Sequence, residues 1–272
     1  MKINRLLAPL LLTLLTTLPL RAQGPTDPAL HDFEPDGEYD LLVNGQPVPD
    51  AQIARAGHLP AYLLVSKSLA SPVLLLPRES VARAVGAEAV VRRADGMIDI
   101  AAGAKLTTLG PLTVQGESAS FTLDGKTWGL RPKPALVGLH SAADLESYNV
   151  TFRRRADRYT PNAEALKALR DNKRKVLVHV VFGSWCPHCQ AKIPLLLRTE
   201  RELKGSQITI EYYGLPRPPE AWTDPEARRL AVNSVPMAVV SIDGREAGRI
   251  LSAAWDTPEV ILSRIVTPAP SQ

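Results

Sequence analysis

The residues best suited to chemistry in this 272-residue chain are its two cysteines, Cys186 and Cys189. A cysteine thiolate is a strong nucleophile, and two thiols separated by two residues can close into a disulfide and reopen by exchange. A purely structural bridge is the first alternative. A loop of about four residues would stabilise a fold by only ~2 kcal/mol, against ~4.7 kcal/mol for a loop of about 100 residues. The spacing therefore favours a redox pair.

Metal binding is the second alternative for the same segment. Two thiolates and the imidazole of His188 leave a tetrahedral zinc site one ligand short. We expect no metal, and no cofactor beyond the two sulfurs.

The sequence around the cysteines indicates how they would be held. Residues 176–182 form a continuous apolar run, which is typical of a strand buried on both faces. A helix is expected from Pro187 to about residue 203. Cys186 would then lie at a helix N-terminus, where backbone N–H groups and the helix dipole favour an anion. Cys186 is therefore predicted to attack substrate, and Cys189, one turn further on, to resolve the mixed disulfide.

His188 lies in the same first turn and is predicted to lower the pKa of Cys186, by a hydrogen bond or by its positive charge when protonated. Because the thiolate exists only in the reduced protein, a lower pKa would make the pair more oxidising.

The rest of the C-terminal part alternates strands and helices, which predicts a mixed sheet covered on both faces. Expected helices span 160–172, 187–203, 225–232 and 258–265, and expected strands span 176–182, 208–213, 237–242 and 247–251.

The motif Trp-Cys-Pro-His-Cys at residues 185–189 resembles the active site of the thioredoxin superfamily, and its central Pro-His pair resembles that of the DsbA family of periplasmic disulfide oxidants. Pro194 resembles the proline that kinks the first active-site helix of thioredoxins. Val235-Pro236, before an apolar strand, resembles the cis-proline loop. The resemblance covers residues 160–266 and implies a thioredoxin-like α/β domain. It implies these roles: catalytic Cys186 and Cys189, redox tuning by Pro187 and His188, and substrate binding by Trp185, Val235 and Pro236.

The chain departs from that family at the buried acid six residues before the first cysteine, where it has Val180. Either Glu211 on the next strand replaces this acid and tunes the pair, or the resolving cysteine has no protein base. The chain also lacks room for the large helical insertion of the DsbA family. His179 is expected to be a core histidine. Trp222 is expected to pack, with substrate contact as the alternative.

Residues 38–138 are predicted to form a mostly β domain. Asn44-Gly45, Asp95-Gly96 and Asp124-Gly125 each separate apolar stretches, and such pairs supply the positive φ angles of tight hairpin turns. This half has no cysteine and matches no family. We expect it to bind substrate or a partner, or to self-associate as the N-terminal domains of disulfide isomerases do.

The N-terminus has a basic start, an apolar run from residue 6 to 20 and a small residue at Ala22, which predicts a secretory signal over residues 1–22. The run is short for a permanent membrane anchor. An extended leader (23–37), a basic linker (139–159) and a tail (267–272) complete the expected organisation. Such a protein would be periplasmic or otherwise exported, without stable membrane insertion.

The charge of the chain excludes a nucleic-acid binder, because three of its +4 formal charges come from Lys2, Arg5 and Arg21 in the expected signal. The basic residues of 153–175 are expected to form a solvated face, with a docking patch as the alternative. Together the patterns predict an exported thiol–disulfide oxidoreductase that acts on protein cysteines, with oxidation as the favoured direction, and that exchanges electrons with a redox partner protein. The alternatives are a thioredoxin-like reductase, a disulfide isomerase, or a binding protein with a non-catalytic cysteine pair.

Overall fold

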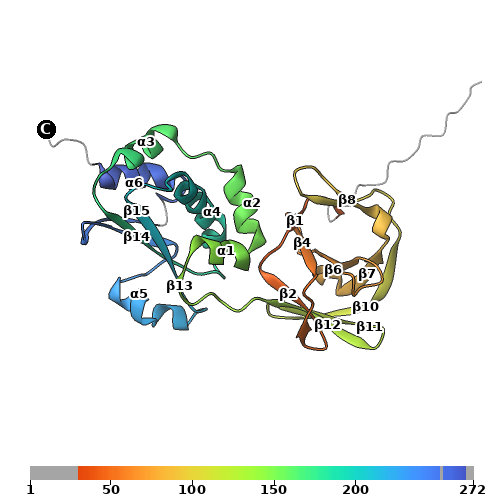
Figure 1. Cartoon of the computed structure of the whole chain (residues 1–272). Helices are drawn as coiled ribbons and strands as arrows, with labels where there is room; N and C mark the ends of the chain where they lie inside the picture. Colours follow the sequence, from red (N-terminus) through yellow and green to blue (C-terminus); the bar gives the residue numbers. More distant parts are fainter. Residues whose placement is uncertain (1–29, 252–253, 268–272) are drawn as a thin grey trace, which may run out of the picture.

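A computed structural model describes residues 30–251 and 254–267, and it divides into a β-rich N-terminal part and a C-terminal α/β part that lie side by side (Figure 1). The expected signal, residues 1–22, lies outside the described residues, as do residues 268–272 of the expected tail. None of the helices within the described ranges is both long enough and apolar enough to cross a membrane.

The N-terminal part is an antiparallel sheet of twelve strands within the described residues, in the order β3-β2-β12-β11-β10-β7-β6-β5-β4-β1-β9-β8. Asn44 and Asp124 have positive φ, and each is followed by a glycine with positive φ, as the predicted hairpin turns require. The strands are β1 (Phe33–Pro35), β2 (Tyr39–Val43), β3 (Gln46–Pro47), β4 (Gln52–Ala56), β5 (Tyr62–Val65), β6 (Val73–Leu76), β7 (Val81–Val85), β8 (Val90–Arg92), β9 (Ile98–Ile100), β10 (Leu106–Gln115), β11 (Ser118–Leu123) and β12 (Lys126–Pro132).

The sheet begins earlier than the expected boundary at residue 38. Phe33 is fully buried in one of the two hydrophobic cores of this part, and β1 pairs with both β4 and β9. The leader predicted for residues 23–37 is therefore wrong over its last residues. Prolines and acidic residues in this stretch suggested an extended leader, but Phe33–Pro35 forms β1, which the buried ring of Phe33 anchors in the core.

The C-terminal part contains a five-stranded sheet in the order β13-β15-β14-β16-β17, in which β14 and β15 are parallel and the other neighbours are antiparallel. Its strands are β13 (Gly138–His140), β14 (Val176–Phe182), β15 (Ile208–Gly214), β16 (Met237–Ile242) and β17 (Arg245–Ile250). Its helices are α1 (Ala142–Tyr148), α2 (Val150–Arg158), α3 (Ala163–Asp171), α4 (Pro187–Glu202), α5 (Pro225–Arg229) and α6 (Pro258–Val266). Helices α2, α3, α4 and α6 lie on one side of this sheet and α5 on the other (Figure 1).

Most predicted elements of this part agree with the structure to within a few residues. Helix α3 begins at Ala163 and not at residue 160, because Asn162 caps it: the Asn162 side chain accepts a hydrogen bond from the Ala165 N–H. Pro194 lies inside α4, as expected.

The linker predicted for residues 139–159 is wrong. This stretch contains the end of β13 and all of α1 and α2, and Leu145, Phe152 and Ala156 are fully buried in the same core as α4. Its many arginines suggested a solvated segment, whereas its apolar residues recur at helical spacing and supply a buried face. The C-terminal domain therefore begins near residue 138 instead of 160.

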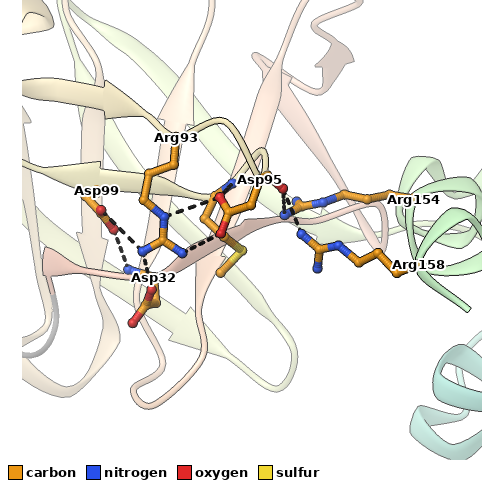
Figure 2. A network of polar contacts seen from close by, with 7 residues as sticks. Asp32, Arg93, Asp95, Asp99, Arg154 and Arg158 are labelled. Carbon is orange, nitrogen blue, oxygen red and sulfur yellow. Dashed lines mark hydrogen bonds and ion pairs between the residues drawn. The ribbon is translucent and has the colours of Figure 1, made fainter.

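The two parts are joined by polar contacts between α2 and the turn of the β8–β9 hairpin (Figure 2). Arg154 and Arg158 both donate to the backbone oxygen of Asp95, at 2.8 and 2.7 Å. The Asp95 carboxylate in turn pairs with Arg93 at 2.8 Å, and Arg93 pairs with Asp32 at 2.7 Å. The basic residues of α2, expected to form a solvated face, thus partly serve to dock the N-terminal part.

Candidate functional site

The two cysteines lie where β14 passes into α4. Cys186 occupies the N-cap position with extended backbone angles, and Pro187 follows as the first helical residue. A proline is tolerated there because that position has no intrahelical partner for an N–H. Cys189 is one turn into the helix and fully buried, whereas Cys186 is 7% exposed. Both thiols are free.

The two sulfurs differ in acidity. The pKa of Cys186 is lowered to about 6, first because the Cys189 thiol donates a hydrogen bond to its sulfur, and then because the backbone N–H groups of Cys189 and His188 point at it; burial opposes the shift. The pKa of Cys189 is raised well above its ordinary value, first by burial and then by Cys186. At neutral pH the pair therefore carries one thiolate, on the cysteine nearer the surface.

His188 is exposed. It lowers the pKa of Cys186 first through its backbone N–H and second through the charge of its ring. The imidazole is thus a minor influence in this arrangement. Pro187 is exposed beside it.

Trp185 packs over the loop that carries the cysteines. Its indole N–H lies 2.9 Å from the backbone oxygen of Pro216 and 3.2 Å from that of Leu215. A Cβ on Gly183 would lie 2.6 Å from the indole ring, so only glycine fits beneath it. The aromatic ring of the residue before Cys186 is therefore held by main-chain atoms on two sides.

Val235 and Pro236 border the site on another side. The backbone oxygen of Val235 lies 3.7 Å from the Cys186 sulfur, and the Val235-Pro236 peptide bond is cis, as the resemblance predicted. The Cys186 sulfur thus lies beside the backbone oxygen of a residue that is 49 positions further along the chain and directly precedes the cis proline.

Glu211 does not belong to this group, and its predicted redox role is wrong. Tyr212 points toward α4, where its hydroxyl donates to Glu200 at 2.7 Å. Neighbouring residues of a strand point to opposite faces, so Glu211 points away from α4. There its carboxylate lies 2.5 Å from the Nδ1 atom of His179. The position of the family's buried acid is filled by Val180, which is fully buried.

His179 is mostly buried, as expected of a core histidine, but it lies between two carboxylates. Besides Glu211 at Nδ1, Glu226 of α5 lies 2.9 Å from its Nε2 atom. This cluster is on the face of the sheet opposite the cysteines.

Three polar residues that support the site were not predicted. The Ser184 hydroxyl accepts from the Leu136 N–H at 3.0 Å, and the Ser184 backbone oxygen accepts from the Gln190 side chain at 3.1 Å. Arg155 of α2 donates to the Gln190 backbone oxygen at 3.1 Å and pairs with Glu34 of β1 at 3.2 Å. These contacts connect the first turn of α4 to the N-terminal part. The sequence offered one indication of Ser184 and Gln190, because these residues directly flank the cysteine motif at residues 185–189.

Comparisons with known proteins give partial structural likenesses. No family model and no curated protein match the chain. An HIV epitope scaffold is 16% identical over 47% of this chain and 86% of its own, with a TM-score of 0.36. A mutant thioredoxin from Halobacterium salinarum is 17% identical over 41% of this chain and 90% of its own, with a TM-score of 0.27. Mitochondrial thioredoxin 3 from Saccharomyces cerevisiae is 18% identical over 42% of this chain and 99% of its own, with a TM-score of 0.26.

Proposed function

We propose that this chain is an exported thiol–disulfide oxidoreductase with a thioredoxin-like C-terminal domain, and that it oxidises protein thiols through Cys186 and Cys189. The observation that carries the proposal is the asymmetry of the two sulfurs: one borders the surface at the start of α4 with a pKa of about 6, and the other is buried beside it with a raised pKa. A structural disulfide does not require two cysteines that differ in pKa and burial, whereas thiol–disulfide exchange needs one attacking and one resolving thiol.

In the oxidising direction a substrate thiolate attacks the Cys186 sulfur of the closed disulfide. The sulfur–sulfur bond to Cys189 breaks, and Cys189 leaves as a thiolate that takes up a proton. A second substrate thiolate then attacks the substrate sulfur of the mixed disulfide and releases Cys186 as a thiolate. The substrate gains a disulfide, the enzyme gains two electrons, and a redox partner protein must remove them.

The lowered pKa of Cys186 supports the oxidising direction, because it stabilises the leaving thiolate and the reduced enzyme. The basic, apolar and small-residue pattern of residues 1–22 supports export. Arg155 of α2 links the N-terminal sheet to the helix that carries the cysteines, so we propose that this sheet contributes to substrate or partner binding, or to self-association, and not to the exchange itself.

A dithiol-oxidation assay tests this function, with insulin reduction measured in parallel. The oxidised protein should convert a dithiol peptide to its disulfide, and Cys186→Ser should abolish the reaction. Faster insulin reduction than dithiol oxidation would reverse the proposed direction. Absence of both reactions would leave a binding protein with a non-catalytic cysteine pair.

A further inference from the structure

The helix that carries the cysteines, α4, contains a proline at position 194. An α-helix is held by hydrogen bonds from each backbone N–H to the carbonyl oxygen four residues earlier, and proline has no N–H. Pro194 therefore cannot donate to the backbone oxygen of Gln190. Gln190 is only 6% exposed, and a carbonyl oxygen without a donor is costly in a buried position. A donor from outside the helix would therefore stabilise this oxygen.

Arg155 of α2 supplies such a donor. Its Nη1 atom lies 3.1 Å from the Gln190 backbone oxygen, and its Nη2 atom lies 3.2 Å from the carboxylate of Glu34 on β1. The guanidinium is rigid and planar, so one side chain binds both groups at once through separate N–H donors. Helix α2 lies between α4 and the N-terminal sheet (Figure 1). Arg155 thus connects the start of α4 to the N-terminal part.

Gln190 in turn holds the main chain around Cys186. Its backbone N–H donates to the backbone oxygen of Cys186 at 3.0 Å, and its side-chain amide donates to the backbone oxygen of Ser184 at 3.1 Å. The acidity of Cys186 depends on the backbone N–H groups of His188 and Cys189, which point at its sulfur. A displacement of Gln190 would therefore move the attacking sulfur relative to two of the donors that stabilise its thiolate.

We propose that Arg155 is a positioning residue for the redox pair, and that Glu34 of the N-terminal part holds Arg155 in place. This inference rests on the proposed function and assigns the N-terminal part an influence on the same site. Arg155 replaces the hydrogen bond that Pro194 cannot make, and so keeps Gln190 where it holds Cys186. It acts through Gln190 and not on the sulfurs. The N-terminal part then takes no step in the exchange but helps to set the acidity of the attacking thiol.

The test is iodoacetamide labelling of the reduced full-length protein across pH, with peptide mapping, which reports the Cys186 midpoint and needs no enzyme activity. Arg155→Met keeps the apolar stem but has no N–H donor. In this variant the midpoint should rise by about half a pH unit, because the thiolate loses aligned donors. The reduction potential, measured against glutathione, should fall with it, since a less stable thiolate makes the pair less oxidising.

Arg158→Met is the matched control. Arg158 lies on the same helix and also contacts the N-terminal part, where it donates to the backbone oxygen of Asp95 at 2.7 Å. The control therefore removes one arginine and one contact between the two parts without removing the bond to Gln190. It should leave the midpoint and the potential unchanged.

Glu34→Ala separates positioning from a simple effect of charge. Removal of a negative charge would by itself favour the Cys186 thiolate and lower the midpoint, whereas release of Arg155 should raise it. Glu34 is partly exposed, so this variant carries the test if circular dichroism shows that Arg155→Met does not fold. A lowered or unchanged midpoint in Glu34→Ala would overturn the inference. So would an unchanged midpoint in a folded Arg155→Met variant, or an equal rise in the control.

The labelling experiment and the dithiol-oxidation assay fail independently. A protein that oxidises dithiols but labels with the same midpoint in every variant would keep the enzyme and refute the role of Arg155. A protein whose midpoint shifts as expected but that exchanges no disulfide would keep the positioning role and refute the enzyme.

Discussion

The Cys189 thiol donates a hydrogen bond to the Cys186 sulfur, and this contact is the first cause of the lowered Cys186 pKa. Cys189 therefore favours the thiolate form of Cys186 when both thiols are free. The pKa of Cys189 is raised first by burial and then by this contact, because the donor keeps its proton while the neighbouring sulfur is charged.

Cys189→Ala should raise the pKa of Cys186 above 6, since the thiol donor is lost while the backbone N–H groups remain. The pH dependence of iodoacetamide labelling, with peptide mapping, measures this. In the wild-type protein Cys186 should label with a midpoint near pH 6 and Cys189 slowly throughout. An unchanged midpoint in Cys189→Ala would assign the shift to the helix N-terminus instead.

The reduction potential should change slope near pH 6. The thiolate stabilises the reduced protein fully above the ordinary thiol pKa, and this stabilisation is lost as the pH falls through about 6. Below pH 6 reduction takes up two protons and the potential should fall by ~59 mV per pH unit; above pH 6 it takes up one, and the slope should be ~30 mV.

At neutral pH the lowered pKa of Cys186 raises the reduction potential only modestly. An unperturbed thiol is still protonated at pH 7, so the stabilisation of the reduced protein comes only from the difference of about one unit between pH 7 and the Cys186 pKa. This difference corresponds to ~1.4 kcal/mol, or ~30 mV. Equilibration with glutathione at several pH values measures both the slope and this offset. A potential near −270 mV, the thioredoxin level, would refute the oxidising direction.

A fragment of residues 157–272 should fail to fold stably, whereas a fragment of residues 134–272 should fold. The shorter one lacks Leu145, Phe152 and Ala156, which are fully buried against α4. Circular dichroism and thermal unfolding compare the two. In the full-length chain, Phe152→Ala should lower the free energy of unfolding by about 3–5 kcal/mol. A stable, active 157–272 fragment would contradict the assignment of α1 and α2 to this core.

Glu211→Gln should leave the labelling rates of both cysteines unchanged, because Glu211 contacts His179 on the opposite face of the sheet. Thermal unfolding of this variant should show a small loss of stability from the broken contact. A shift in the pH profile of Cys189 labelling would restore Glu211 to the redox site.

The local sequence was sufficient to predict the strands, helix starts and turns whose structure depends on neighbouring residues in the chain. The apolar run of β14, the start of α4 at Pro187 and the hairpin turns at Asn44 and Asp124 each follow from backbone preferences of a few consecutive residues. The proposal for Cys186 and Cys189 rests on the same kind of local pattern, since their spacing alone places them one helical turn apart.

Tertiary structure alone decided what depends on distant residues. The face of β15 that meets α4 determines that Tyr212 and not Glu211 approaches this helix, and no local pattern sets that orientation. The burial of Phe152 within an arginine-rich helix and the contact of Trp222 with Trp185 arise in the same way. Each requires segments separated by tens of residues to pack together, and packing depends on the shape of the whole core.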